Sequence, residues 1–521
     1  MAELEIIDAE IVPNASREQA LAASSDLPAA TAAAAAKDNS APTLSSIYPV
    51  YTQAEREAAL RLLAPSKYDV VLGAGWTDSS DPSSASEDDT DTVRRASSSS
   101  SSSSFSSPST PPTVSPLTSS TNAAATGQRG RSDALLVRSC SQGWSLSFEL
   151  TPHQPIPVPQ SADELVIRND AVGLNPVDWK SVSYNFGIPA FPWILGRDIA
   201  GTVIQPPVDN DEGWKAGDRV WTCADSREMR AGGYQRFSVH RKGTLAKIPS
   251  AVKDEDAATL GTGLITAAVA LFAFFKLPFA PRQDDEEEAL AEKLSGVGIS
   301  QKKDERDWIL IYGGGAVTGI YATQLAALSN LRVITVASRS NFDYLRSIGT
   351  TAFVDRHQPP EAIVSSITAV LAQHGGELRY AMDCVSSSTA NLCLDALQNS
   401  AAAKGGSKGE ELICLAGNPK AEPGQVKVHK ISFSTTFYHP DGEFARRVLG
   451  YVTRLLEDGR LQPCRPEVLP DGLAGIRSGL ELLRDGKAPR ARKLVVRVRD
   501  TPAADVTHLG VRTELGWNGV V

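Results

Sequence analysis

Short hydrophobic runs dominate the first part of the chain that has a folded composition, which begins near Asp133. These runs are rich in β-branched and aromatic residues and are separated by Pro, Gly and Asp: ALLVRS, WSLSFEL, ELVIRNDAVGL, IAGTVIQ, DRVWT and YQRFSVH. Short strands at such close spacing, with turn residues between them, are typical of a small and mostly antiparallel β domain.

From residue 307 to about 437 the pattern changes to longer units. Apolar strand-like runs alternate there with helical stretches, in the order WILIYG, TGIYATQLAALS, RVITVA, FDYLRSIG and AFVD. Because a strand–helix–strand unit returns its second strand parallel to the first, this alternation predicts a doubly wound parallel sheet with helices on both faces. Further on, EFARRVLGYVTRLLEDGRL is expected to form an amphipathic helix and ARKLVVRV a closing strand.

One segment between these two parts has no charged residue over 19 positions. Residues 257–275, AATLGTGLITAAVALFAFF, have about the length that a bilayer span requires. The segment also contains two Gly and three Thr, and no second apolar stretch accompanies it. We therefore expect a buried helix packed between two domains, and keep a membrane span as the alternative.

Low-complexity sequence fills most of the N-terminal third. Residues 1–45 are rich in Ala and Ser, and residues 78–128 include eight consecutive serines from Ser97 to Ser104. Such a composition buries too little apolar area to offset the entropy of ordering the chain, so residues 1–130 are predicted to be largely disordered. A phosphorylated regulatory segment is the alternative for the serine-rich part. The acidic run Asp284–Glu288 is expected to be a solvated loop.

Charge and cysteine content narrow the class of protein. The chain has 521 residues, with 52 Lys and Arg against 61 Asp and Glu, and its formal net charge is −9. A negative field repels phosphate backbones and no long basic patch is present, which argues against a nucleic-acid partner. Six scattered cysteines form no CxxC pair, and the N-terminus has no export signal pattern. We therefore expect a reducing, cytoplasmic location and no membrane partner.

The most informative motif is a glycine-rich turn directly after a predicted strand. In WILIYGGGAVTG the strand leads into three glycines, and a helix follows. Glycines let the backbone turn tightly and approach a pyrophosphate, whose charge the helix N-terminus then stabilises. The pattern departs from GxGxxG, and an ordinary strand–helix turn is the alternative. The predicted cofactor-binding residues here are Gly313, Gly314, Gly315, Ala316, Val317, Thr318 and Gly319.

The end of the next strand indicates which nicotinamide cofactor is bound. An NAD site would place Asp or Glu there to accept from the adenosine ribose hydroxyls, but RVITVASRSN offers Ser338 and Arg339. A hydroxyl and a guanidinium suit a 2′-phosphate instead. We therefore predict NADPH, with Asn341 in the same loop included in the site. A solvated arginine at the loop end is the alternative for Arg339.

Several motifs in a fixed order resemble a known family. They are GLNPVDWK (Gly173–Lys180), LGRDIAGTV (Leu195–Val203), GDRVW (Gly217–Trp221), GGYQRFSVH (Gly232–His240) and GKAPRARKLVVRV (Gly486–Val498). The chain resembles the medium-chain dehydrogenase/reductase superfamily, in its zinc-free quinone oxidoreductase and enoyl reductase branch. YGGGAVTG and SRSNFDYLRSIG are most similar to the fungal enoyl reductases that serve polyketide synthases in trans. The similarity runs from about Asp133 to Arg499.

This resemblance implies an α/β protein with two domains and a cleft between them. A GroES-like, β-rich substrate domain is expected from residues 131–265 and 460–500, and a Rossmann NADPH-binding domain from residues 266–459. Residues 501–521 would form a tail. The resemblance also implies that no metal is bound, because Asn175 and Arg197 occupy positions where zinc-dependent relatives carry Cys and His.

Without a metal, the expected reaction is hydride donation to a C=C bond conjugated to a carbonyl, with a proton from a side chain or water. By resemblance, the loop before Lys180 lines the cleft beside the nicotinamide. Asn175 and Lys180 are expected to donate hydrogen bonds and Tyr184 to supply a proton; a surface lysine and a packed aromatic are the alternatives. Further predicted cofactor contacts are Thr266, Asp383, Cys384, Val385 and Gly417.

The leading hypothesis is therefore an NADPH-dependent, zinc-independent enoyl reductase acting on a small-molecule or acyl-carrier-bound substrate. A polyketide synthase is the expected partner, and the protein is expected to be a monomer or a homodimer. A quinone oxidoreductase is the alternative among enzymes. A non-catalytic NADPH-binding sensor or interaction protein is the alternative from another class.

Overall fold

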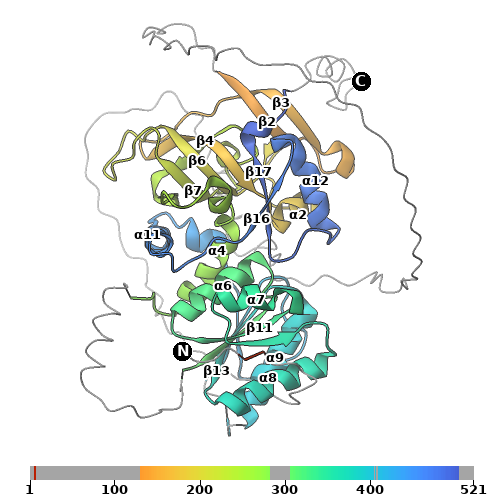
Figure 1. Cartoon of the computed structure of the whole chain (residues 1–521). Coiled ribbons are helices and arrows are strands. Elements are labelled where there is room, and N and C mark those ends of the chain that lie inside the picture. Colours follow the sequence, from red (N-terminus) through yellow and green to blue (C-terminus); the bar gives the residue numbers. More distant parts are fainter. Residues whose placement is uncertain (1–4, 7–129, 282–305, 404, 407–408, 504–521) are drawn as a thin grey trace, which may run out of the picture. The chain divides into compact units, whose positions relative to one another are not determined.

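The computed structural model describes residues 5–6, 130–281, 306–403, 405–406 and 409–503 (Figure 1). Most of the Ala- and Ser-rich N-terminal region, the acidic run Asp284–Glu288 and most of the expected tail lie outside these residues. Within the region expected to be disordered, Glu5–Ile6 form a two-residue strand, β1, that pairs in parallel with a later strand.

The first part of the described chain forms a β-rich unit, as the short hydrophobic runs predict, and two strands from the C-terminal part, β16 and β17, join it. A three-stranded antiparallel sheet has the order β3-β2-β5, and a larger sheet has the order β16-β17-β4-β6-β7-β9, with β8 paired to β4. All pairs in the larger sheet are antiparallel except β16 with β17. The strands are β2 (Arg131–Val137), β3 (Phe148–Pro155), β4 (Glu164–Gly173), β5 (Trp193–Ile194), β6 (Asp198–Gln205), β7 (Arg219–Cys223), β8 (Phe237–Arg241), β9 (Leu245–Lys247), β16 (Pro466–Leu469) and β17 (Lys493–Arg497).

Two details of this unit differ from the sequence-based expectation. The start of the run WSLSFEL is a 3₁₀ turn, Trp144–Leu146, because Gly143 at φ 84° bends the chain before β3 begins. The segment between β16 and β17 also contains a helix, α12 (Gly472–Arg484), which packs against α2 (Pro176–Tyr184).

The second part is a parallel sheet with the order β1-β12-β11-β10-β13-β14-β15. Without β1, this is the order 3-2-1-4-5-6 of a dinucleotide-binding sheet, in which ligands bind where the order reverses, here between β10 and β13. The strands are β10 (Trp308–Tyr312), β11 (Arg332–Ala337), β12 (Ala352–Asp355), β13 (Leu378–Asp383), β14 (Glu411–Cys414) and β15 (Lys427–His429). The register aligns Tyr312 with Val336 and Asp383, so these three strands end together.

Alternate residues of β10 point into two different cores. Ile309 and Ile311 belong to one buried cluster, and Trp308 and Leu310 belong to another. Helices therefore cover both faces of the sheet, which confirms the doubly wound prediction. The helices from the glycine-rich segment onward, up to β16, are α6 (Val317–Leu328), α7 (Phe342–Ser347), α8 (Pro360–His374), α9 (Ser387–Ala403), α10 (Phe433–Phe437) and α11 (Glu443–Glu457).

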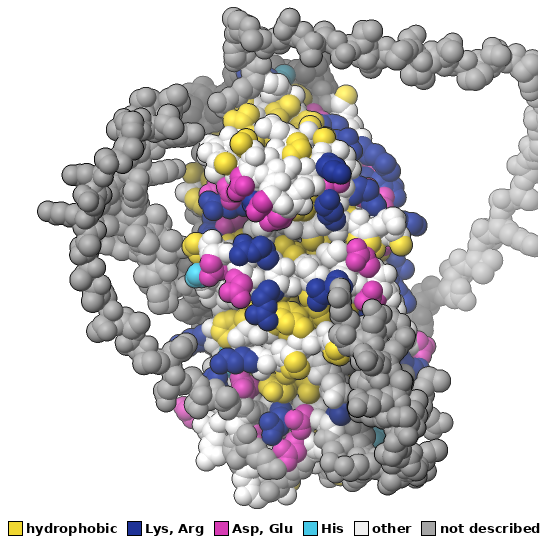
Figure 2. Space-filling model, turned by 90° about the vertical axis from the view of Figure 1, so that its left-hand side faces the viewer, with side chains coloured by type: hydrophobic (Ala, Val, Ile, Leu, Met, Phe, Trp, Pro, Cys, Tyr) yellow, Lys and Arg dark blue, Asp and Glu magenta, His cyan; other side chains and the backbone are white. Residues whose placement is uncertain are grey.

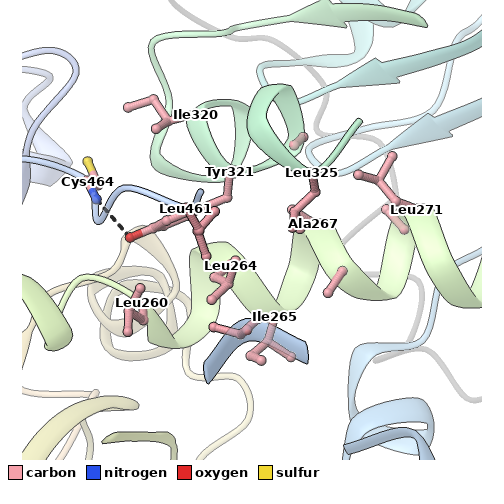
Figure 3. Packing of buried hydrophobic residues seen from close by; sticks show 14 of the residues in the cluster. Leu260, Leu264, Ile265, Ala267, Leu271, Ile320, Tyr321, Leu325, Leu461 and Cys464 are labelled. Atoms are coloured by element: carbon pink, nitrogen blue, oxygen red, sulfur yellow. Dashed lines mark hydrogen bonds between the residues drawn. The ribbon is translucent and has the colours of Figure 1, made fainter. Parts of the chain in front are cut away.

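The uncharged segment 257–275 is buried inside the protein. It forms the end of α3 (Asp254–Ala257), then α4 (Gly261–Ala268), and then a π-helical turn, Val269–Phe274, rather than one continuous helix. Leu264 and Ile265 of α4 lie in the same core as Tyr321 and Leu325 of α6 (Figure 3). The burial of these side chains bears out the prediction of a buried helical segment. None of the helices in the described part of the chain is long and apolar enough to cross a bilayer.

Charges of both signs share the surface. On the face that Figure 2 shows, Lys and Arg side chains lie beside Asp and Glu over much of the view. Among the described residues, surface ion pairs include Arg168 with Asp170 and Arg227 with Asp225.

Candidate functional site

The turn after β10 requires glycine at several positions. Gly313 has φ 88°, a backbone conformation that side chains disfavour. A Cβ on Gly314 would overlap the Cγ2 methyl of Thr335, and a Cβ on Gly319 would overlap the carbonyl oxygen of Gly313. Gly319 therefore lets α6 pack closely on the turn, and Gly314 lets the turn lie against β11. This is the close backbone approach that a pyrophosphate site needs.

Helix α6 begins directly after this turn and presents its N-terminus there. Ala316 is the N-cap residue, no side chain caps the first turn, and the first turn carries no acidic residue. The first N–H groups of a helix have no partner within the helix, and the helix dipole makes this end favourable for anions. Val317 and Thr318 open α6, so their N–H groups lie at this end of the helix. A Cβ on Gly315 would lie 3.1 Å from Asn341 Nδ2, so the Asn341 side chain lies close to the turn.

Polar and cationic side chains gather where β11 and β12 end. Arg356 Nε donates to Ser338 Oγ at 2.7 Å, and His357 Nε2 lies 3.4 Å from the same oxygen. Arg339 Nε donates to Asp355 Oδ2 at 2.8 Å, and this pairing lowers the pKa of Asp355 despite its partial burial. The structure thus joins Ser338 and Arg339 to a second pair, Arg356 and His357, that the sequence analysis did not single out.

The carboxyl ends of β13 and β14 complete the edge of the parallel sheet. Buried Asp383 accepts hydrogen bonds from the N–H groups of Val385 and Ser386, and burial raises its pKa to about 6. Val385 is 48% exposed, and its Cγ2 would lie 2.6 Å from a Cβ on Gly313, so it borders the glycine turn. Burial raises the pKa of the Cys384 thiol well above its usual value, which keeps it protonated.

Gly417 lies one strand further on, at φ 139°, against the backbone of Ser387 at the start of α9. The structure therefore brings Gly313 and Val385 into contact, whereas Gly417 contacts the next helix rather than the turn. Thr266 lies on α4, three residues after Gly263, and is partly buried. A Cβ on Gly263 would lie 2.7 Å from Val317, so this face of α4 packs on the start of α6.

The predicted catalytic residues lie on or next to α2. Asn175 is the N-cap residue of α2 and is 4% exposed; its N–H donates to Asp178 Oδ2 at 2.9 Å. Tyr234 also donates to this oxygen, at 2.9 Å, while burial raises the pKa of Asp178 to about 6. These bonds hold Asp178 at the first turn of α2, where it orients the loop that carries Asn175.

The other two predicted residues differ in exposure. Burial lowers the pKa of Lys180, whose ammonium lies 5.8 Å from the centre of the Trp179 ring. Tyr184 packs against the same ring at 5.8 Å between centroids and is 44% exposed. Lys180 is therefore partly desolvated rather than fully solvent-exposed, and Tyr184 is accessible to solvent.

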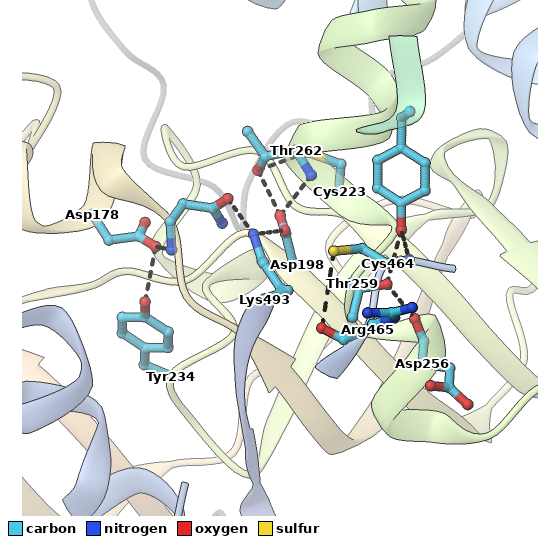
Figure 4. Close-up of polar contacts among 12 residues, drawn as sticks. Asp178, Asp198, Cys223, Tyr234, Asp256, Thr259, Thr262, Cys464, Arg465 and Lys493 are labelled. Atoms are coloured by element: carbon cyan, nitrogen blue, oxygen red, sulfur yellow. Dashed lines mark hydrogen bonds and ion pairs between the residues drawn. The ribbon is translucent and has the colours of Figure 1, made fainter. Parts of the chain in front are cut away.

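Next to Asn175, the structure has a buried ion pair. Lys493 Nζ lies 2.7 Å from Asp198 Oδ2, and both side chains are at most 2% exposed (Figure 4). Thr262 donates to Asp198 Oδ1 through its N–H and its hydroxyl, at 2.7 and 2.5 Å. Nearby Cys223 is a buried thiol whose pKa burial raises to about 12. Among the described residues, no group of three His, Cys, Asp or Glu side chains is placed to hold a metal ion.

Comparison with known proteins identifies the family. Residues 161–253 match the model of the alcohol dehydrogenase GroES-like domain. A trans-enoyl reductase of Aspergillus sclerotiorum, resD, is 30% identical over 360 residues, which are 66% of this chain and 95% of that protein. The trans-enoyl reductase FSL5 of Gibberella zeae is 31% identical over 366 residues, covering 66% and 92% of the two chains. The chain belongs to the trans-enoyl reductase family.

Solved structures support the same fold. The CurK enoyl reductase aligns with a TM-score of 0.54 at 16% identity, over 70% of this chain and 99% of that one. The mycobacterial protein Rv1454c, solved with NADPH, aligns with a TM-score of 0.52 at 20% identity, over 70% and 99%. These likenesses show a medium-chain dehydrogenase/reductase fold with a GroES-like unit and a parallel Rossmann sheet, as the motifs predict.

Membership of the trans-enoyl reductase family confirms the resemblance drawn from the motifs. The residues that sequence analysis missed come from distant segments: Arg356 and His357 follow the third parallel strand, and Lys493 lies on the closing strand. The letters RH after AFVD are a visible signal for the first two, since Arg356 at that strand end lies beside Ser338. No local pattern marked Lys493 as a neighbour of Asn175, 318 residues away.

Proposed function

We propose that the protein is an NADPH-dependent enoyl reductase that reduces a C=C bond conjugated to a carbonyl, on a small-molecule or acyl-carrier-bound substrate, without a metal. Family membership supports the reaction class. The observation that carries the cofactor assignment is the glycine turn: Gly314 and Gly319 leave no room for a side chain, and the turn leads into the uncapped N-terminus of α6.

Bound NADPH would supply a hydride to the β-carbon of the conjugated system. The C=C electron pair then moves onto the carbonyl as an enolate, and a proton added to the α-carbon completes the saturated product. Asn175 and Lys180 would donate hydrogen bonds to the carbonyl oxygen, where negative charge develops. Tyr184, which is accessible to solvent, would deliver the proton and recover one from water.

The preference for NADPH rests on the cluster at the ends of β11 and β12. Ser338, Arg339, Arg356 and His357 offer a hydroxyl and up to three cationic groups in the place where a ribose-binding carboxylate would serve NADH. Asp355 accepts from Arg339 in this cluster and would hold the guanidinium in place rather than bind the ribose.

Zinc independence is supported by the Asp198–Lys493 pair. A metal would have to displace a buried ammonium that already neutralises Asp198, and Asn175 offers only a neutral amide.

We also propose the division into a substrate domain (131–265 and 460–500), a Rossmann domain (266–459) and a tail (501–521). A cytoplasmic location is supported by six cysteines that are all free thiols. A polyketide synthase partner and a monomeric or homodimeric state complete the proposal.

The direct test is NADPH oxidation by the full-length protein with α,β-unsaturated thioesters, enones and quinones. Turnover of thioesters or enones supports the proposal. Turnover of quinones alone would make the protein a quinone oxidoreductase. NADPH binding without turnover of any of these would leave a cofactor-binding sensor or interaction protein.

The cofactor preference has its own test. Arg339→Asp and Arg356→Gln should each weaken NADPH binding about 10- to 100-fold in a fluorescence titration while changing NADH binding little, because each removes a phosphate partner. Arg379→Gln is a matched control, because Arg379 is the second residue of β13 and pairs with Asp307, at the end of the strands away from the glycine turn. Equal losses for both cofactors would refute the 2′-phosphate assignment.

A further inference from the structure

The side-chain amide of Asn175 is held by its oxygen alone. Lys493 Nζ donates to Asn175 Oδ1 at 2.5 Å, and an ammonium has only donors, so the amide oxygen must face it. The Nδ2 group therefore points away from Lys493. It is buried and has no hydrogen-bond partner among the described residues. A buried NH₂ without an acceptor is unfavourable, and it is explained if an acceptor enters when the site is filled.

Lys493 is itself fixed by a second buried group. Asp198 Oδ2 lies 2.7 Å from Lys493 Nζ, and its other oxygen accepts two hydrogen bonds from Thr262 on α4. Two glycines leave the space that this pair occupies. A Cβ on Gly173 would lie 2.9 Å from Lys493 Cε, and a Cβ on Gly261 would lie 2.7 Å from Asp198 Cβ. Asp198 and Lys493 are therefore confined to one arrangement.

The amide and the pair lie next to the glycine turn. The N–H of Ala491, two residues before Lys493, donates to the carbonyl oxygen of Gly315 at 3.2 Å. Helix α4, which carries Thr262, contacts the start of α6 through Gly263. Figure 4 shows Lys493 joined to Asp198, and Asp198 joined in turn to Thr262. Lys493 also donates to Asn175 Oδ1. The closing strand and α4 thus connect Asn175 to the proposed pyrophosphate site.

We infer that Lys493 is a positioning residue: held by Asp198, it fixes the Asn175 amide so that Nδ2 donates to a carbonyl oxygen of a bound molecule. This rests on the proposed function. The carbonyl belongs either to the unsaturated substrate or to the nicotinamide carboxamide. In the first case the hydrogen bond strengthens as the enolate forms and acts mainly on kcat. In the second case it acts on the affinity for NADPH.

The test must remove Lys493 without leaving Asp198 as an unpaired buried charge. The double variant Lys493→Met/Asp198→Asn does this, and Asn175→Ser removes the NH₂ while keeping a hydroxyl at the N-cap position. If the acceptor is the substrate carbonyl, we expect both the double variant and Asn175→Ser to lower kcat with an unsaturated thioester about 10- to 100-fold. If the acceptor is the nicotinamide carboxamide, we expect a changed Kd for NADPH instead. The control Arg138→Met/Glu149→Gln neutralises a partly buried ion pair beside the three-stranded sheet, and it should leave both values within about twofold.

Because Lys493 is proposed to act through Asn175, the effects must not multiply. Adding Lys493→Met/Asp198→Asn to Asn175→Ser should cause no further loss of kcat or of NADPH affinity. Multiplied losses in the triple variant would overturn the inference, as would an unchanged kcat and Kd in the double variant.

A spectroscopic arm separates this inference from the proposed function. In protein labelled with ¹⁵N-asparagine, the side-chain NH₂ signals of Asn175 are assigned by their absence in Asn175→Ser. Adding NADPH and then an unsaturated thioester should shift them in the wild type and not in Lys493→Met/Asp198→Asn. If the wild type shows this shift but no turnover, the proposed function fails and the positioning role stands. If neither addition shifts the signals, the positioning role is refuted.

Discussion

Replacing Gly314 by Ala tests directly whether the turn after β10 must lie against β11. The added Cβ would come closer than 3.0 Å, the distance below which real Cβ contacts essentially never occur, to the Cγ2 methyl of Thr335. Thr335 is fully buried and donates to or accepts from Thr350 at 3.0 Å, so its side chain cannot easily turn away. We expect Gly314→Ala to lower the free energy of unfolding by about 1–3 kcal/mol and to weaken NADPH binding, because the turn must move outward.

A second substitution should relieve this overlap. Thr335→Ser deletes the methyl but keeps the hydroxyl, and alone should cost about 1 kcal/mol for the lost buried methyl group. In Gly314→Ala/Thr335→Ser the nearest atoms to the new Cβ become Thr335 Cβ at 3.3 Å and Leu345 Cδ1 at 3.7 Å, which is close to ordinary contact. The double variant should therefore be within about 1 kcal/mol of Thr335→Ser.

Urea unfolding followed by tryptophan fluorescence measures the three variants, and a titration with NADPH measures their affinities. If the destabilisation of the double variant equals the sum of the two single effects, the close approach of Gly314 to β11 is not the cause. The same conclusion follows if Gly314→Ala alone is as stable as the wild type.

The remaining predictions concern titration and catalysis. Burial raises the pKa of Asp383 to about 6 in the folded protein, against 3.8 in the unfolded chain, so its contribution to stability is fully present below pH 3.8 and is lost as the pH rises through 6. Asp383→Asn should remove this fall, which amounts to about 3 kcal/mol at most, from the pH profile of the free energy of unfolding. An unchanged profile would contradict the assignment. Because burial lowers the pKa of Lys180, turnover should fall with rising pH at a lower pH than the loss of a proton from an ordinary lysine would give. Lys180→Met should lower kcat about 100-fold and abolish that pH dependence. A variant with wild-type kcat would exclude Lys180 from the reaction. Tyr184→Phe should lower kcat at least tenfold with an unchanged Kd for NADPH, whereas full activity would assign proton delivery to water.

Much of the parallel sheet could be predicted from the sequence because its signals are local. WILIYG, RVITVA and AFVD are continuous apolar runs bounded by turn residues, and each forms the expected strand. The glycine turn was recognisable for the same reason, since a strand, three glycines and a helix are contiguous. The short 3₁₀ turn at Trp144–Leu146 could not be predicted, because its apolar residues have the composition of a strand. Only the backbone conformation of Gly143, which precedes the turn, distinguishes it from one.

The sequence by itself determined the strand, glycine turn and helix that we propose as the dinucleotide site, with Ser338 and Arg339 where an NAD site would have a carboxylate. The tertiary structure decided which side chains face one another. It placed Arg356 beside Ser338 by pairing β11 with β12. It placed Lys493 between Asn175 and Asp198 by pairing β17 with β4 across more than 300 residues of chain. Glycine turns depend on backbone conformations that neighbouring residues set, whereas a buried ion pair depends on the packing of strands that are distant in sequence. For that reason the cofactor turn was visible in the sequence and the positioning of Asn175 was not.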